Sequence, residues 1–346
     1  KGGVRPLGIP AVEDRLVQRG MTRILTAIYE SLFLETSWGF RPKRNAHQTI
    51  RRLNRAIWFG SVRHVVDVDI EKFFDTVNHD KMMECLRQRI KDTSLLRLIV
   101  RFLKAGIMEE GKYLASEVGT PQGGNLSPML ANVYLHYALD LWFERVFKSK
   151  CGGFVQLTRY CDDFIAVFEH QEEAQAFSQQ LQERLQGVSL KINASKSRIV
   201  AFGKEVWEKA KAGQGPKPGT FDFLGFTHFC TRTRKGTFKV GRKSSSKKFR
   251  AKCQAMNLWL RRVRTIALKT WWPIFRAKLV GHYRYYGISD NSYSIESYYK
   301  RCEEMAFKWL NRRSQKRSYN WKQFKRLLHW NPLPYPRIYV NLYAMA

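Results

Sequence analysis

Apolar positions change their spacing along the chain at about residue 230. Before that point, short segments with apolar residues at every second position alternate with segments of helical spacing, which predicts an α+β region. After residue 246, apolar residues recur every three or four positions and predict a helix: Phe249, Cys253, Met256, Leu260 and Val263. A Gly/Pro loop at 211–220 and a basic, Ser/Gly-rich stretch at 231–246 lie between the two regions. We therefore expect an α+β domain over 1–230 and a basic helical domain over 231–346.

Acidic residues stand at the ends of two predicted β-segments. In the strand His64–Ile70 the alternation places Asp67, Asp69 and Glu71 on one face. Residues 157–168 predict a hairpin whose tip carries the adjacent Asp162 and Asp163. Neighbouring carboxylates repel each other, and a divalent cation between them relieves that repulsion. Together these acids are a ligand set suited to two-metal phosphoryl transfer, although an Asp-Asp turn alone is weak evidence.

A glycine-rich loop at 119–126 leads into a predicted helix. Ser127 suits the N-cap and Pro128 the first helical position, and an apolar stripe follows: Leu130, Val133, Tyr134, Tyr137 and Leu141. Glycines let the backbone approach a base pair or phosphate closely, and Gln122 offers both a donor and an acceptor. The alternative is an ordinary helix-entry turn.

The charge is large and concentrated in the last third of the chain. There are 61 Lys and Arg against 29 Asp and Glu, and 28 of the basic but only 4 of the acidic residues lie in 231–346, together with 21 aromatic residues. Such an excess indicates a polyanionic partner, although a solvated basic face over an aromatic core is compatible with the same pattern. The basic side chains that we expect to contact RNA or duplex phosphates form two groups: Lys247, Lys248, Arg250, Lys252, Arg261, Arg262 and Arg264, and then Arg312, Arg313, Lys316 and Arg317.

Composition narrows the class of protein further. A hydrophobic content of 44% excludes wholesale disorder, and the six cysteines form no C-x-x-C pair that would indicate a zinc ribbon. No uncharged apolar window reaches the length of a membrane span. The chain opens on Lys1 without a signal peptide, so we expect a trimmed or partial protein. These observations predict a soluble, intracellular, nucleic-acid-binding protein that does not associate with membranes.

Successive sequence blocks resemble those of group II intron reverse transcriptases. The blocks are RPLGIP (5–10), SWGFRP (37–42), VDIEKFFD (68–75), TPQGGNLSP (120–128), RYCDD (159–163), LKINASKS (190–197) and FLGF (223–226). The last third resembles the maturase, or X, domain of that family in LVGHYRYYGISDN (279–291), WLNRRSQKRSYNW (309–321) and PLPYPRI (332–338). The resemblance implies a right-hand polymerase: fingers and palm over 1–230, without the N-terminal extension, and an all-helical thumb over 231–346.

The resemblance also implies roles for individual residues. Asp69, Asp162 and Asp163, with the Ile70 carbonyl, would bind two Mg²⁺ ions, for which Mn²⁺ could substitute. Phe74 would exclude a 2′-hydroxyl, and Gln122 would touch the incoming dNTP. Arg5 would grip its triphosphate, and Lys196 would lie near the pyrophosphate as a charge stabiliser or an acid. The primer grip would consist of Phe223, Leu224, Gly225 and Phe226. Asp67 and Asp75 are expected to be solvated or structural neighbours rather than metal ligands.

The implied activity is RNA-directed DNA synthesis combined with maturase binding of intron RNA for splicing and retrohoming. Its partners would be group II intron RNA, an RNA template with a DNA primer, and target DNA, in the bacterial cytoplasm or nucleoid. Cys161 replaces the alanine most common in the family, and we expect the endonuclease-lacking bacterial type of this family, since residues 231–346 contain no endonuclease-like segment with paired cysteines. Two alternatives stay open: an RNA-binding splicing factor with a vestigial polymerase site, and a domesticated reverse transcriptase serving defence or repair.

Overall fold

The chain folds into two compact units in the computed structural model, which describes residues 8–109, 112–114, 119, 124–315 and 318–343. Unit 1 comprises residues 1–219 and 233–238, and unit 2 comprises 220–232 and 239–346. The expected boundary at 230/231 falls inside a strand, Phe226–Arg232, and is therefore misplaced. The Gly/Pro loop at 211–220 marks the division better, because unit 1 ends at Gly219 and a strand begins at Thr220, the last residue of that loop.

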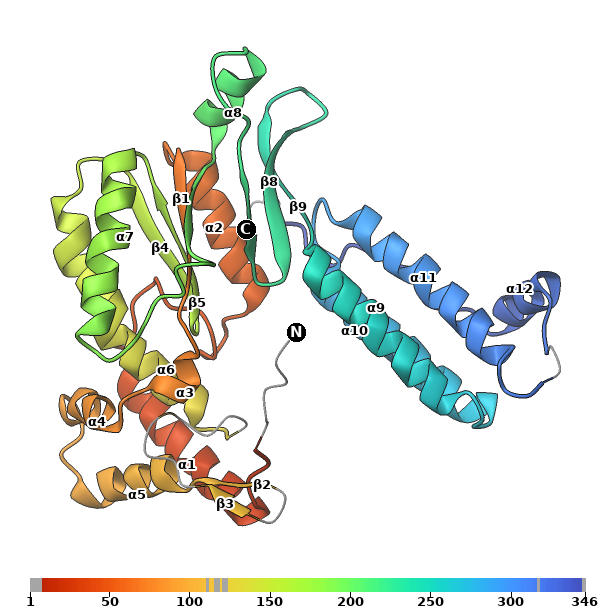
Figure 1. Ribbon diagram of the computed structural model, residues 1–346, viewed down its shortest axis with the longest axis horizontal. Helices are drawn as coiled ribbons and strands as arrows, with labels where there is room; N and C mark the ends of the chain where they lie inside the picture. Colours follow the sequence, from red (N-terminus) through yellow and green to blue (C-terminus); the bar gives the residue numbers. More distant parts are fainter. Residues whose placement is uncertain (1–7, 110–111, 115–118, 120–123, 316–317, 344–346) are drawn as a thin grey trace. The chain divides into compact units, whose positions relative to one another are not determined.

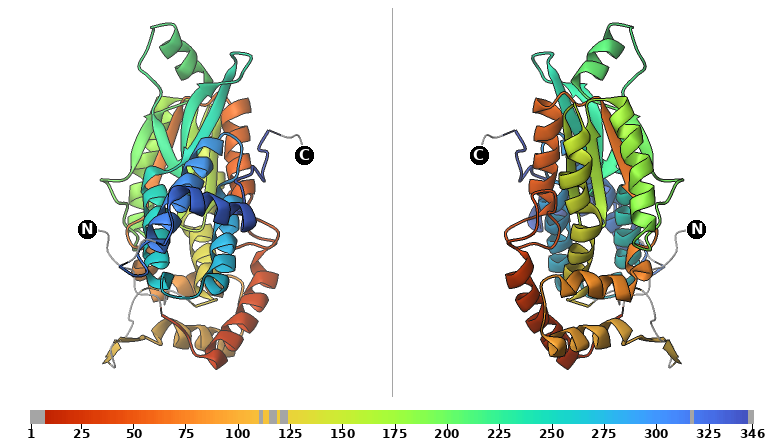
Figure 2. Two further views of the ribbon diagram at one scale, coloured as in Figure 1. Left: turned by 90° about the vertical axis from the view of Figure 1, so that its right-hand side faces the viewer. Right: turned by 90° about the vertical axis from the view of Figure 1, so that its left-hand side faces the viewer.

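Unit 1 is built on a four-stranded antiparallel sheet of order β4-β5-β1-β6 (Figure 1). Its elements in chain order are α1 (Val12–Tyr29), α2 (Ala46–Phe59), β1 (His64–Asp69), α3 (Phe73–Thr76), α4 (His79–Arg87), α5 (Thr93–Lys104), β2 (Ile107–Glu109), β3 (Lys112–Leu114), α6 (Ser127–Leu135), the π-helical η1 (His136–Asp140) and η2 (Phe143–Phe147), the 3-10 turn η3 (Lys148–Lys150), β4 (Val155–Tyr160), β5 (Asp163–Phe168), α7 (Gln171–Gln186), β6 (Arg198–Ala201) and α8 (Lys204–Lys211). Helix α7 packs against β1 and β5, whereas α2 packs against the edge strand β4 (Figure 2).

Local sequence explains where the unit 1 helices begin. Asn45 and Gln48 form a capping box at α2, and the side chains of Asn78 and Asp92 accept backbone hydrogen bonds at the starts of α4 and α5. Helix α6 departs from expectation, because it starts at Ser127 itself, and Leu126 is the N-cap. It is also buried on nearly all sides rather than along a stripe, since it runs through the interior of the unit.

In its described residues, unit 2 combines a small sheet with four helices. The three-stranded sheet consists of β7 (Thr220–Phe223), β8 (Phe226–Arg232) and β9 (Phe238–Ser244), and the helices are α9 (Ser246–Val263), α10 (Leu268–Tyr286), α11 (Ser292–Leu310) and α12 (Trp321–Trp330). The expectation that 231–346 is all-helical is thus wrong. The basic character of 231–246 obscured the alternation in β9, where Phe238, Val240 and Arg242 are buried.

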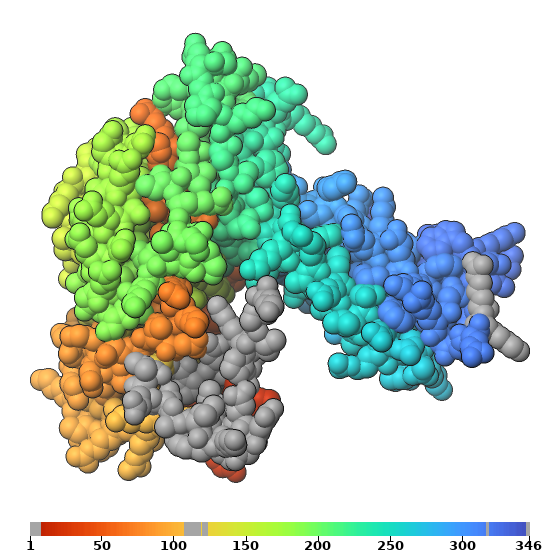
Figure 3. Space-filling view, viewed as in Figure 1, coloured from red at the N-terminus to blue at the C-terminus, as the bar shows by residue number. Residues whose placement is uncertain are grey.

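The aromatic residues of unit 2 divide between core and surface. Trp271, Trp272 and Phe275 of α10 are buried and in ring contact, whereas Trp330 is 79% exposed. Most of the basic residues singled out on α9 are exposed, Arg264 is partly buried, and α9 lies on the visible face of unit 2 in the space-filling view (Figure 3). Of the second group, Arg312 is exposed and Arg313 partly buried, while Lys316 and Arg317 lie outside the described residues. No helix in the described ranges is long and apolar enough to cross a membrane.

Candidate active site

The strand register of unit 1 brings two of the three predicted acids together. Strands β4 and β5 form the predicted hairpin, in which Tyr160 pairs with Asp163, and Cys161 and Asp162 make the two-residue turn. Strand β1 lies on the other side of β5, so that Asp69 is the direct cross-strand partner of Asp163. Directly opposed residues of an antiparallel pair have side chains on the same face. Asp69 and Asp163 therefore share one face at one end of the sheet, beside the turn that carries Asp162.

Burial in this turn keeps the Cys161 thiol neutral. Cys161 adopts a left-handed conformation with φ of 59° and is 4% exposed. Burial, and to a lesser extent the charge of Asp162, raises the pKa of this thiol to about 12. A neutral, buried thiol adds no charge to the neighbouring carboxylates, as expected for a small apolar replacement of alanine.

The segment around Lys196 lies against the end of β1. The Glu71 amide donates to the Lys191 carbonyl at 2.8 Å, and the Asn193 amide donates to the Asp69 carbonyl at 2.8 Å. These bonds bring Lys196 Nζ to 2.9 Å from Asp69 Oδ2. Because the two side chains are 61% and 46% exposed, the ion pair contributes little to stability. The ion pair matters for its position, because it places the Lys196 ammonium next to Asp69, the first predicted metal ligand.

Arg159 holds the acidic turn from inside unit 1. Its guanidinium donates to both carboxylate oxygens of Asp140, with Nε at 2.8 Å from Oδ1, and to Asn132 Oδ1 at 3.0 Å. It also donates to the carbonyl of Cys161 at 2.9 Å, directly before Asp162. The Arg159 and Asp140 side chains are fully buried. The sequence analysis did not predict this network. Arg159 and Asp140 each stand within an apolar segment, and a charged residue in such a position indicates a buried partner.

The segment 37–41 packs onto the same turn. A Cβ at Gly39 would lie 2.6 Å from the Cys161 nitrogen, so only glycine permits this approach. The Gly39 carbonyl accepts a hydrogen bond from Asn132 Nδ2 at 2.7 Å, which joins this segment to the Arg159 network. Arg41, buried and bidentate to Glu30, braces the segment from its other end.

Phe74 lies in the short helix α3, close to the glycine-rich loop. It is partly buried and makes an edge contact with the fully buried Phe73 at 5.3 Å between ring centroids. Gly119 approaches α3 so closely that a Cβ there would be 2.8 Å from the Phe74 carbonyl oxygen, and its φ of 90° also favours glycine. Gln122 and Arg5, the two other predicted nucleotide contacts, lie outside the described residues.

The predicted primer-grip residues form a tight hairpin in unit 2, not in the first domain as expected. Phe223 and Phe226 pair across β7 and β8 and are buried. Between them, Leu224 and Gly225 have φ of 50° and 81°, the pattern of a two-residue hairpin turn. The Leu224 carbonyl accepts from Tyr285 Oη at 2.9 Å, which fixes this turn against α10.

Two other acids near Asp69, Asp67 and Asp75, lie in different surroundings. Asp67 lies 3.7 Å from Arg198 Nε across the β1–β6 pair. Asp75 is exposed within α3, the short helix that precedes α4, and α4 itself is capped by Asn78.

Comparison with known proteins places the chain in a family. The family model described as reverse transcriptase (RNA-dependent DNA polymerase) matches residues 1–228. The chain belongs to the reverse transcriptase family.

Among curated relatives, the group II intron-encoded protein LtrA of Lactococcus lactis is 44% identical over 38% of this chain and 22% of its own length. Protein YkfC of Escherichia coli is 32% identical over 57% of this chain and 60% of its own. Nuclear intron maturase 1, mitochondrial, of Arabidopsis thaliana is 34% identical over 33% of this chain and 16% of its own. This reverse transcriptase chain thus spans less than two thirds of these relatives, and the resemblance to group II intron enzymes is confirmed.

The carboxylates of this reverse transcriptase chain suit a magnesium site. The fully described part of the chain contains no group of three or more His, Cys, Asp or Glu side chains already arranged to hold a metal ion. The side chains of Asp69 and Asp163 nevertheless offer carboxylate oxygens, the ligand atoms that Mg²⁺ prefers. Asp69 also binds a cation in this structure, the Lys196 ammonium. The residues present therefore fit a hard divalent cation, with Asp69, Asp162 and Asp163 as the side chains that would hold it.

Proposed function

We propose that the protein is an RNA-directed DNA polymerase of a group II intron. The observation that carries the proposal is the register that opposes Asp69 to Asp163 beside Asp162, within a chain of the reverse transcriptase family. A carboxylate pair on the adjacent strands β1 and β5, with a third acid in the neighbouring β4–β5 turn, is suited to metal-assisted nucleotidyl transfer. The substrates would be dNTPs, an RNA template and a DNA primer.

In this proposal, Asp69, Asp162 and Asp163 hold two Mg²⁺ ions, with the Ile70 carbonyl assisting. When bound, these ions would lower the pKa of the primer 3′-hydroxyl and neutralise charge on the departing pyrophosphate. Arg159 positions the turn through the Cys161 carbonyl, and Lys196 neutralises phosphate charge beside Asp69. Phe74 discriminates against ribonucleotides, while Arg5 and Gln122 contact the incoming nucleotide. Residues 223–226 guide the primer.

We further propose that the chain binds group II intron RNA as a maturase. The names of two relatives, a group II intron-encoded protein and a nuclear intron maturase, support this part, as does the exposed basic surface of α9. Retrohoming into target DNA, in the bacterial cytoplasm or nucleoid, belongs to the same proposal. A purely RNA-binding splicing factor is less well supported, because such a protein would have no need of three carboxylates at adjoining positions.

Primer extension on an RNA template with Mg²⁺ tests the polymerase proposal. Asp162→Asn and Asp163→Asn should each abolish cDNA synthesis, because the ligand charge is lost while the shape is kept. Asp80→Asn, which neutralises an exposed acid on α4, is the matched control and should extend primers at the wild-type rate. All three variants should bind the template–primer with similar affinity. Synthesis at the wild-type rate by either turn variant would overturn the proposed site.

A further inference from the structure

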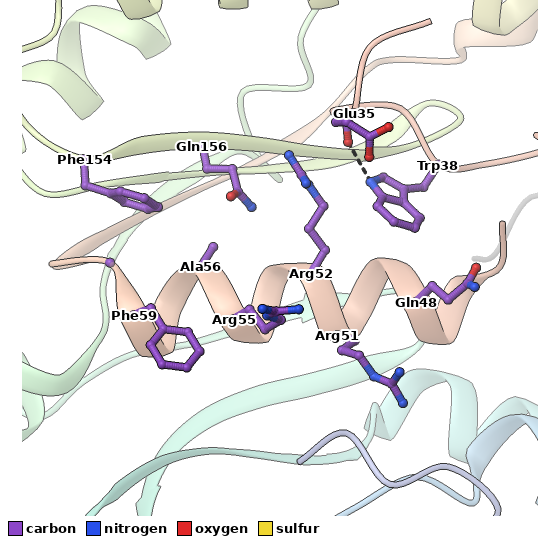
Figure 4. Close-up of a pocket in the computed structure, with 11 residues that line it drawn as sticks. Glu35, Trp38, Gln48, Arg51, Arg52, Arg55, Ala56, Phe59, Phe154 and Gln156 are labelled. Atoms are coloured by element: carbon purple, nitrogen blue, oxygen red, sulfur yellow. Dashed lines mark hydrogen bonds between the residues drawn. The ribbon is translucent and has the colours of Figure 1, made fainter. Parts of the chain in front are cut away.

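A groove lies between α2 and the edge strand β4, lined by side chains that the catalytic proposal does not use. Its volume is about 490 Å³, within the range of roughly 300–1,000 Å³ for ligand sites. The lining residues are Glu35, Trp38, Gln48, Arg51, Arg52, Arg55, Ala56, Phe59, Gly60, Phe154 and Gln156. Arg52 extends from α2 toward the space between Gln156 and Trp38 (Figure 4). Phe59 and Phe154 stand at the far end of the groove from Trp38 (Figure 4).

The groove carries an excess of positive charge. Three arginines line it against one acid, Glu35, and that carboxylate is already paired with Arg44 at 2.6 Å. The hydrogen bond from Arg44 lowers the pKa of Glu35, so the pair persists at neutral pH. Glu35 also interacts electrostatically with Arg52, but one carboxylate that is already paired leaves the three arginines in excess. The charge of the lining complements an anion.

Arg52 is the arginine that would gain most from an anion. It is partly buried, and burial lowers its pKa because the charged guanidinium loses hydration. Its Nε is among the buried polar atoms of the described residues that have no hydrogen-bond partner. A buried, incompletely satisfied cation is costly, and a phosphate near its guanidinium would reduce that cost.

Aromatic rings accompany these cations. The Arg44 and Arg52 guanidiniums lie 4.5 Å and 5.9 Å from the centroid of the Trp38 ring. Phe59 is 79% exposed, although a large apolar side chain at a groove normally packs against something. Aromatic faces for bases beside arginines for phosphates are the features by which proteins bind single-stranded nucleic acid.

We propose that this groove binds a single-stranded segment of RNA, with phosphates at Arg52 and Arg55 and bases against Trp38 and Phe59. The inference rests on the groove's own side chains and adds a contact outside the proposed catalytic residues. The groove is also connected to those residues, because the Trp38 amide donates to the Arg159 carbonyl at 2.9 Å. RNA held there would lie against the segment that packs on the acidic turn.

The test compares two double variants of the full chain. Arg52→Gln/Arg55→Gln removes the proposed phosphate contacts, and Arg97→Gln/Arg101→Gln removes two exposed arginines of α5 with the same change in charge. Fluorescence anisotropy with an oligouridylate of about twelve nucleotides measures affinity at several salt concentrations. The groove variant should bind about tenfold more weakly than the α5 variant. Its salt slope should also be shallower by about 1.4, since each phosphate contact in single strands contributes about 0.7.

A separate variant tests the aromatic part of the groove. Phe59→Ala should lower affinity about fivefold or more while leaving the salt slope unchanged, because stacking releases no counterions. The exposure of Phe59 makes this variant safe for folding, which thermal melting of all variants verifies.

The outcomes that would overturn the inference are distinct from failure of the polymerase. The groove inference would be refuted if the groove and α5 variants bound the oligouridylate with equal affinity and equal salt slope. It would also be refuted if only the α5 variant lost affinity for the oligouridylate. A groove variant that changes the sedimentation of the protein without changing RNA affinity would assign the groove to a second copy of the chain. Binding of a polyglutamate peptide in preference to RNA would assign it to an acidic protein. Primer extension on a saturating template should persist in every groove variant. If the wild-type chain itself does not extend primers, that result refutes the proposed function and leaves the groove inference to the binding assay.

Discussion

Neutralising Asp140 should destabilise unit 1 strongly, although Asp140 lies outside the acidic turn. In Asp140→Asn the side chain keeps its shape, but the Arg159 guanidinium loses its counter-charge where both side chains are fully buried. Removing one partner of a buried ion pair typically costs about 3–5 kcal/mol, because the remaining charge stays desolvated. The hydrogen bonds of Arg159 to Asn132 and to the Cys161 carbonyl restrain it from moving to solvent. We therefore expect a loss of about 3–5 kcal/mol.

Urea denaturation of the full chain, following the transition of unit 1, measures this loss. The matched variant is Asp140→Leu/Arg159→Met, which removes both charges and should recover most of the lost stability, because no buried charge remains. A loss below about 1 kcal/mol in Asp140→Asn would refute the reasoning, since it would mean that the pair is effectively hydrated. Equal losses in the single and double variants would also contradict it.

The double variant separates stability from positioning. It lacks the donor to the Cys161 carbonyl, so the turn that carries Asp162 loses one of its restraints. If Arg159 is a positioning residue, primer extension should fall at least about tenfold at unchanged template affinity, since small misplacements of ligands are costly. A stable double variant with the wild-type extension rate would restrict Arg159 to a structural role.

Three further predictions concern single features of the chain. Phe74→Val should increase ribonucleotide incorporation in single-turnover extension, because the ring would no longer fill the space of a 2′-hydroxyl. Burial lowers the pKa of His282 to about 3, so its neutral form is favoured in the fold, and the unfolded chain takes up the proton first as pH falls below about 6.5. Stability of unit 2 should therefore decline by up to about 1.4 kcal/mol per pH unit below that value, and His282→Gln should show a shallower decline in denaturation at pH 7 and 5. Neutralising Lys248, Arg261 and Arg262 should reduce the salt slope of duplex binding by about 0.9 for each phosphate that the protein no longer neutralises, and an unchanged slope would remove α9 from the RNA surface.

The parts of the site that sequence predicted are those encoded by local patterns. The alternation at 64–70 and the hairpin at 157–168 were recovered because strand periodicity and a two-residue turn are short-range signals. The block resemblance then selected Asp69, Asp162 and Asp163 from all the acids of the chain. Local pattern predicted the strand and the hairpin, and the resemblance selected the acids, but neither indicated what holds these segments in place.

The parts that sequence did not predict depend on contacts between distant segments. The Arg159–Asp140 pair joins a strand to a π-helical segment, and neither residue stands at a periodic position that reveals its partner. The predicted domain boundary at 230/231 was misplaced for a related reason. Three strands from 220 to 244 associate with the helices that follow, and β9 is too rich in Lys, Arg and Ser to be recognised from composition.

The register of β1 against β5 places Asp69 and Asp163 on one face of the sheet. Slipping β1 by one residue would place Asp69 on the opposite face from Asp163, because side chains alternate along a strand. The hairpin beside β1 is held by Arg159 on the Cys161 carbonyl, and the Asn193 amide on the Asp69 carbonyl fixes the end of β1 from its β6 side, which supports this register. Val66 and Val68 stabilise it as well, since the same slip would expose both buried valines. Burial of the apolar residues and alignment of the carboxylates therefore favour the same pairing, so the force that folds the sheet also assembles the acids.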